Sequence, residues 1–108
     1  MKKYHIEITE PAEVDLADAV RYVARELREL AAALRLLRSI EEAMESLEQM
    51  PYRYPLADDE YLSKAGIRIL PVKNYLIFYT AEDQAETVTI IRILYARRDW
   101  MNLLRLDL

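Results

Sequence analysis

The stretch GIRILPVKNYLIFYT (residues 66–80), together with TVTIIRILY (residues 87–95), decides the fold of this chain. Runs of β-branched and aromatic residues between turn residues are typical of strands. Lys73 and Asn74 predict a two-residue hairpin turn, with Asn74 tolerating positive φ. Consecutive hairpins make neighbouring strands antiparallel. We therefore predict antiparallel strands over residues 66–72, 75–80 and 87–95.

Two helices are predicted before this sheet. Pro11 fits the first turn of a helix because its missing N–H has no partner there, and Thr9 or Glu10 can cap that helix. Apolar residues then recur at steps of three and four, which is typical of two packed helices joined by a turn near residues 28–32. The two stripes are Ala12, Leu16, Ala19, Val20, Val23 and Leu27, and then Leu30, Ala33, Leu37, Ile40, Met44 and Leu47.

Three shorter elements complete the expected order. Residues 4–9 alternate apolar and polar side chains, which predicts a first strand. A short turn of helix is expected at residues 58–64. A terminal helix is expected at residues 99–104, with Trp100 among its apolar residues.

The order strand, helix, helix, three strands and a short C-terminal helix predicts an α+β fold of two layers, with residues 1–108 forming one domain. The helical hairpin must cover one face of the antiparallel sheet, because both helices carry an apolar stripe. We expect the second face to be partly open, covered by the terminal helix or by a partner. An open face of this kind is a candidate binding surface.

Composition excludes several kinds of site. The chain has 108 residues with no cysteine, one histidine (His5) and one glycine (Gly66). A disulfide scaffold, a thiolate or multi-histidine metal site and a glycine-rich phosphate loop are therefore excluded. We expect neither a metal nor a small-molecule cofactor.

The net charge and the hydropathy of the chain limit the kinds of partner that it is expected to bind. The net charge is −4, divided into −5 for residues 1–65 and +1 for residues 66–108. General affinity for nucleic acid is not expected, although a local basic site in the last forty residues stays open. The longest uncharged run, residues 74–81, is too short to cross a membrane, and the first residues do not resemble a signal peptide. We therefore expect a cytoplasmic protein without membrane partners.

The order and spacing of these segments resemble the bacterial RelE/ParE toxin superfamily. Residues 66–79 are similar to its arginine-bearing strand and to its Tyr-x-Ile-x-Tyr hairpin partner. Residues 91–100, IRILYARRDW, are similar to its strand end, where an aromatic residue, a glycine, two arginines and an aspartate often follow one another. Ala96 stands here in place of that glycine.

The resemblance implies the toxin of a type II toxin–antitoxin pair. Superfamily members either cleave messenger RNA in the ribosomal acceptor site or inhibit DNA gyrase. The resemblance also implies a protein partner, an acidic and partly disordered antitoxin that neutralises the toxin by wrapping around it.

Four residues are the candidates for catalysis or target contact: Arg68, Tyr95, Arg97 and Arg98. Arg68 matches the family's strand arginine and is interpreted as a phosphate clamp, or as a structural arginine that pairs with an acid. Arg97 and Arg98 beside Tyr95 suit phosphate binding and base stacking, or else pair with Asp99 and the acidic helices.

Two other residues are interpreted as structural. Arg92 is expected to share a strand face with Val88, Ile90 and Leu94, which favours a guanidinium satisfied within the protein. His5 is expected to face solvent in the first strand.

Three functions stay open. We expect ribosome-dependent messenger RNA cleavage, because the candidate arginines suit phosphate chemistry. The proton acceptor is then unassigned unless Glu60 reaches the site, and Tyr95 or Tyr79 would be the proton donor. The alternative is inhibition of DNA gyrase through protein–protein binding. The excess of acidic over basic residues argues less strongly against this function than against RNA cleavage. A third hypothesis is an inactive or redesigned scaffold, because glycine is scarce and the helices are rich in Ala, Leu, Arg and Glu.

Overall fold

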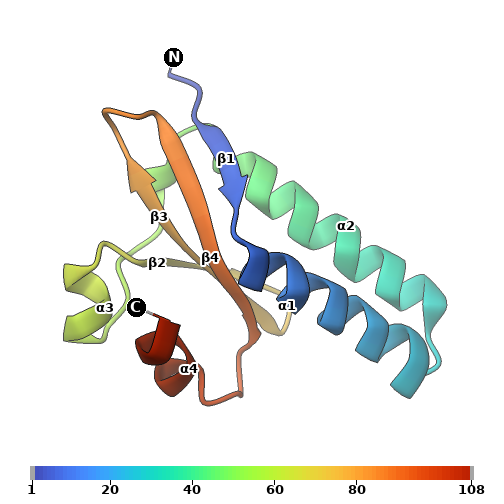
Figure 1. Cartoon of the computed structure of the whole chain (residues 1–108). Coiled ribbons are helices and arrows are strands. Elements are labelled where there is room, and N and C mark those ends of the chain that lie inside the picture. Colours follow the sequence, from blue (N-terminus) through green and yellow to red (C-terminus); the bar gives the residue numbers. More distant parts are fainter. Residues whose placement is uncertain (1, 108) are drawn as a thin grey trace.

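The computed structural model of the chain describes residues 2–107 and contains a four-stranded sheet in the order β1–β4–β3–β2 (Figure 1). The strands are β1 (His5–Ile8), β2 (Arg68–Val72), β3 (Tyr75–Glu82) and β4 (Thr87–Tyr95). β2, β3 and β4 are antiparallel neighbours, as predicted. β1 joins the sheet beside β4 and runs parallel to it, a pairing that the sequence pattern did not predict.

The helical hairpin consists of α1 (Glu10–Arg21), which continues into a π-helical segment (Tyr22–Glu26), and α2 (Leu30–Ser46). The turn between them contains Arg28 in the left-handed region, with φ of 53°. Two further helices are α3 (Glu60–Lys64) and α4 (Trp100–Asp107), and both confirm elements expected from the sequence. No helix within residues 2–107 is both long and apolar enough to cross a membrane.

Thr9 fixes where α1 begins and also ties it to the sheet. Its Oγ1 accepts a hydrogen bond from the amide of Ala12 at 3.3 Å, which caps one of the free N–H groups at the helix start. The same hydroxyl lies 2.9 Å from the carbonyl oxygens of Ile90 and Ile91 in β4 and donates toward them. One side chain therefore ends β1, starts α1 and anchors both to β4.

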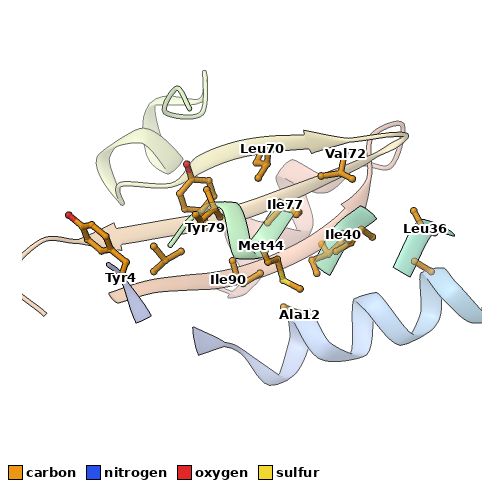
Figure 2. Close-up of a cluster of buried hydrophobic side chains, with 14 residues drawn as sticks. Tyr4, Ala12, Leu36, Ile40, Met44, Leu70, Val72, Ile77, Tyr79 and Ile90 are labelled. Atoms are coloured by element: carbon orange, nitrogen blue, oxygen red, sulfur yellow. The ribbon is translucent and has the colours of Figure 1, made fainter. Parts of the chain in front are cut away.

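The main core lies between the helical hairpin and one face of the sheet (Figure 2). Its centre is formed by fully buried side chains from α2 and the strands, among them Ile40, Ile77, Tyr79, Val88 and Ile90. Burying each large apolar side chain contributes about 1.5–3 kcal/mol, so this face accounts for most of the packing energy. The helical hairpin covers one face of the sheet, as predicted.

The opposite face of the sheet is covered in part by α3 and α4, which confirms the terminal helix, rather than a partner, as its cover, while Ile69, Leu76 and Ile91 stay only partly buried. α3 and α4 lie on this side of the sheet in Figure 1. Leu62 of α3 and Leu104 of α4 are fully buried against Phe78 of β3 and Leu94 of β4. The Trp100 ring lies 5.2 Å from that of Phe78, which confirms Trp100 as the anchor of the terminal helix. Leaving such a cluster in water would cost several kcal/mol, so the terminal helix folds over it.

A β-bulge in β4 changes the direction of Arg92. Phe78 pairs with Arg92 while the next residue, Tyr79, pairs with Ile90, so Ile91 is the extra residue. Val88 and Ile90 consequently face the helical hairpin, whereas Leu94 packs on the other side. The prediction that all of them share one face with Arg92 was therefore wrong, since a bulge breaks the alternation.

Arg92 forms a buried ion pair with Asp15 of α1, which confirms its structural interpretation. Its Nε and one terminal nitrogen donate to the two carboxylate oxygens at 2.6 and 2.9 Å. The backbone amide of Ile93 donates to the same carboxylate at 3.0 Å. Asp15 is only 8% exposed, so α1 and the bulged part of β4 are joined by one dehydrated, bidentate contact.

We predict that Asp15→Ala lowers the free energy of unfolding by about 3–5 kcal/mol, because it leaves a largely buried guanidinium without its counter-charge. Asp15→Asn, which keeps an acceptor for the Ile93 amide, should cost less. Urea denaturation followed by circular dichroism measures both. Asp18→Ala, one turn along the same helix, is the matched control, because its ion pair with Arg21 is exposed and should contribute less than about 1 kcal/mol. Equal losses for Asp15→Ala and Asp18→Ala would contradict this prediction.

Candidate functional site

A groove lies where β3 begins and β4 ends, beside the junction of α1 with the π-helical segment. Tyr75 and Tyr95 pair across the two strands, and their rings meet edge to face with centroids 5.6 Å apart. Tyr22 contributes the third aromatic wall from the helix side. Two adjoining hollows of about 250 and 450 Å³ share these three tyrosines. We call this feature the tyrosine groove.

The two ends of the tyrosine groove differ in polarity. The hollow of about 450 Å³, which we call the outer hollow, is also lined by Val23, Leu27 and Asn74, so it is mainly apolar. The hollow of about 250 Å³, which we call the inner hollow, is also lined by Asp15, Asp18, Ala19, Ile93 and Arg98. An amphipathic occupant would therefore direct its apolar part outward along the tyrosines and its polar part toward the inner end.

The acidic groups at the inner end already have cationic partners. Asp15 is bound by Arg92, and Asp18 accepts a hydrogen bond from Arg21 at 3.0 Å. The exposed Arg98 is different, because no hydrogen bond or ion pair with the side chains of residues 2–104, which the structure describes, holds its guanidinium. The turn that carries it is fixed by its backbone amide, which donates to the Tyr95 carbonyl at 3.0 Å. Arg98 is therefore the cation in the groove that is available to a ligand.

The Tyr75 phenol of the groove keeps its proton at neutral pH, because its pKa is raised. Burial raises the pKa of Tyr75 above its usual value, and the nearby Tyr95 and Tyr22 raise it further. A raised phenol pKa keeps the neutral hydroxyl, which donates and accepts hydrogen bonds but does not act as a base near pH 7.

Arg68 lies away from the tyrosine groove. It pairs with Tyr79 in the sheet, whereas Tyr95 pairs with Tyr75, four residues along β3. That spacing corresponds to about 13 Å. One terminal nitrogen of Arg68 donates to the carbonyls of Tyr54 and Tyr52 at 2.7 and 3.2 Å, and its guanidinium lies 5.1 Å from the Tyr52 ring centre. Its partners here are two carbonyls and a ring, not the acid that one interpretation required.

The four candidate residues are therefore brought together only in part. Tyr95 and Arg98 line the tyrosine groove, Arg97 is exposed next to Arg98, and Arg68 holds the loop that follows α2. The roles of all four in catalysis or target contact stay predictions. No sequence pattern marked Tyr22, Tyr75 and Asp18 as part of the site, because the strand partner and the helix that bring them to Tyr95 come from distant parts of the chain.

The remaining proton-transfer candidates lie elsewhere. Tyr79 is fully buried, and its hydroxyl donates to the Pro51 carbonyl at 2.6 Å. Burial raises the pKa of Tyr79 to about 12, although the nearby Arg68 and Arg53 oppose the shift. Glu60 pairs with Lys64 on α3 at 3.1 Å and does not line the groove. His5 is exposed in β1, as expected.

Comparison with known proteins supports a family assignment. The model of the family described as "ParE toxin of type II toxin-antitoxin system, parDE" matches residues 6–100. A chain of the chromosomal ParDE system from P. aeruginosa has a similar fold, with a TM-score of 0.72 at 18% identity over 90% of this chain and 100% of that one. A chain of the RelBE2 toxin–antitoxin complex from Mycobacterium tuberculosis has a TM-score of 0.59 at 25% identity over 88% of this chain and 93% of that one. No curated protein matches the sequence.

The buried phenol of Tyr79 predicts a specific alkaline instability. Its pKa is about 12 in the folded protein and about 10 in an unfolded chain, so its stabilising effect is complete below pH 10 and is lost as the pH rises toward 12. Tyr79→Phe should cost about 1–2 kcal/mol at pH 7, since the Pro51 carbonyl loses its donor, and should make the loss of stability between pH 10 and 12 smaller. Thermal unfolding across this pH range tests both effects. Tyr61→Phe, which changes an exposed tyrosine, is the control and should reproduce the wild-type profile.

Proposed function

We propose that this chain, which belongs to the ParE toxin family of type II toxin–antitoxin systems, arrests growth by binding a protein, DNA gyrase, rather than by cutting RNA. The family match extends the superfamily resemblance found in the sequence. We choose gyrase binding over RNA cleavage because of the side chains of the tyrosine groove. They combine aromatic walls with one cation, Arg98, that is available to a ligand.

The walls of the groove suit a protein partner. Tyr22, Leu27 and Tyr95 are 53%, 53% and 40% exposed, which is high for large side chains with apolar surface. Tyrosine and arginine are enriched at the energetic centres of protein interfaces, because they offer a large contact area together with a polar group. A partner that covers these side chains would gain apolar burial from Leu27 and the rings and one charge-assisted hydrogen bond from Arg98.

The same groove is less suited to RNA. A polyanion needs several cationic contacts, because each phosphate neutralised adds to the affinity. The carboxylates of Asp15 and Asp18 line the inner hollow, and Arg98 is the one arginine that lines it. Arg68, the other predicted phosphate clamp, donates its hydrogen bonds to backbone carbonyls.

RNA cleavage is the second candidate, since Asp18, Tyr95 and Arg98 line one hollow. In that mechanism Asp18 would accept the proton of the attacking 2′-hydroxyl, Tyr95 would protonate the leaving oxygen and Arg98 would hold the phosphate. Arg21 binds one oxygen of the Asp18 carboxylate at 3.0 Å, so the other oxygen would take the proton.

We further infer that a cognate antitoxin neutralises this chain and that both act in the cytoplasm. The two similar structures come from a ParDE system and from a RelBE2 toxin–antitoxin complex. The antitoxin would keep the toxin from its target while it is bound.

Expression under an inducible promoter tests the function directly. Growth should stop, and the purified protein should inhibit DNA supercoiling by gyrase without cleaving messenger RNA in a ribosome-containing extract. Cleavage in the extract with normal supercoiling would establish the second candidate. Normal growth, with neither effect, would instead identify an inactive scaffold.

Substitutions at Tyr95 distinguish a role in contacting a protein partner from a role as the proton donor in RNA cleavage. If Tyr95 is part of a protein interface, Tyr95→Phe should keep most of the inhibition, whereas Tyr95→Ala should weaken it by about thirtyfold, the size of an interface hot spot. If its hydroxyl is the proton donor, Tyr95→Phe should be as inactive as Tyr95→Ala.

Arg98→Ala should weaken inhibition under the proposal, and Arg53→Ala, on the loop near Arg68, is a matched control for loss of one positive charge. Full activity in both Tyr95→Ala and Arg98→Ala would exclude the tyrosine groove as the contact surface.

A further inference from the structure

The outer edge of β1 is open along two residues. β1 is the last strand of the sheet, with β4 on one side. The amides of His5 and Thr9 donate to the carbonyls of Glu86 and Ile90, so the odd-numbered residues face β4. The even-numbered residues face the other way, and the amide of Tyr4 donates there to the Glu48 carbonyl at 2.8 Å.

Ile6 and Ile8 follow Tyr4 on this outward side. Within residues 2–107 no other strand pairs with their outward N–H and C=O groups. An exposed row of backbone donors and acceptors is a template for an added strand. The contact between Tyr4 and Glu48 shows that this edge already accepts a backbone partner at its first position.

A groove runs along the open edge. Three hollows of about 460, 340 and 470 Å³ follow one another from Tyr4 to the crossing of α1 and α2, and neighbouring hollows share Ile6 or Ile8. We call this continuous feature the edge groove. Its apolar lining is formed by Ile6, Ile8, Leu16, Ala17, Val20, Leu37 and Met44.

The rim of the edge groove is acidic. Glu41 and Glu45 line it from successive turns of α2, Glu48 lines it from the turn after that helix, and Glu13 lines it from α1. Basic residues lie at its ends, where Lys3 is 4.0 Å from Glu48 and Arg21 is bound to Asp18. Within the described residues, no ion pair of 4.0 Å or less involves Glu41 or Glu45. The middle of the groove therefore attracts positive charge.

We propose that the edge groove binds an extended, basic segment of another protein, which adds to the sheet as a fifth strand beside β1. Lys and Arg side chains meet both requirements of the groove, because their aliphatic stems cover Ile6, Ile8 and Met44 while their charged groups reach Glu41 and Glu45. The backbone of the segment pairs with the outward groups of Ile6 and Ile8. This surface involves none of the residues of the tyrosine groove, so the inference does not depend on the proposed function.

A second copy of this chain is a poor occupant of the edge groove. A two-fold antiparallel pairing of two β1 edges around Glu7 would set the two Glu7 side chains directly opposite each other, where like charges are destabilising. It would also bring the two acidic rims of α2 together. Charge therefore favours a different protein with the opposite sign.

Hydrogen exchange and a synthetic peptide test the proposal. The probe is a peptide of about eight residues in which Arg alternates with Val or Thr, with a control peptide that carries Glu in place of Arg. When the Arg peptide binds the full chain, the amides of Ile6 and Ile8 should exchange at least about tenfold more slowly, while those of His5 and Glu7, which face β4, should change little. The Glu peptide should not bind.

Variants of the protein test the charge. Glu41→Gln/Glu45→Gln should weaken binding of the Arg peptide by about tenfold at low salt, and added salt should remove most of this difference. Glu42→Gln/Glu82→Gln also removes two exposed carboxylates, neither of which lines the groove, and should bind like the wild type. Of two Arg peptides that are N-methylated on odd or on even residues, one should keep binding, because only one set of amides faces β1.

Three results would overturn the proposal. The first is unchanged exchange at Ile6 and Ile8 with saturating Arg peptide, which would show that no strand is added. The second is equal binding of the Arg and Glu peptides. The third is equal loss of affinity in the two double variants, which would reflect net charge rather than the groove.

Discussion

The contact between Asp15 and Arg92 is the constraint on which the arrangement of this molecule depends. It joins α1 to the bulged part of β4 through two hydrogen bonds from the guanidinium and one from the Ile93 amide. Because Asp15 is only 8% exposed, water competes little for these bonds. The contact sets the height of α1 along β4, and thereby places Tyr22, at the end of that helix, opposite Tyr75 and Tyr95.

The protein itself covers one face of the sheet and much of the other, which leaves the ends and the edge of the sheet as its more open regions. The helical hairpin covers one face, and α3 with α4 covers much of the other. Hollows lined by exposed side chains lie at one end of the central strands, in the tyrosine groove, and along the outer edge of β1. The two surfaces have opposite character, since an uncommitted arginine lies in the first and glutamates surround the second.

The proposed gyrase binding and the proposed strand addition both use these surfaces to contact another protein. An acidic ligand matches Arg98 and a basic ligand matches Glu41 and Glu45, so one small chain has room for two partners at separate places. The chemistry for phosphodiester cleavage is less complete. Tyr79 holds its proton against a backbone carbonyl, Tyr75 has a raised pKa, and Asp18 is bound to Arg21.

The sequence by itself determined the element order, the three antiparallel strands, the two apolar helices and the superfamily, because these follow from local periodicity, turn residues and short motifs. It also placed Tyr95 and Arg98 correctly at one strand end. Only the tertiary structure decided that β1 runs parallel to β4, that a bulge at Ile91 breaks the alternation of β4, that Arg92 pairs with Asp15, that α4 rather than a partner covers much of the second face and that Arg68 binds carbonyls of a distant loop. Each of these depends on contacts between residues far apart in the chain, whose energies are set by register and burial and leave no periodic trace in the sequence.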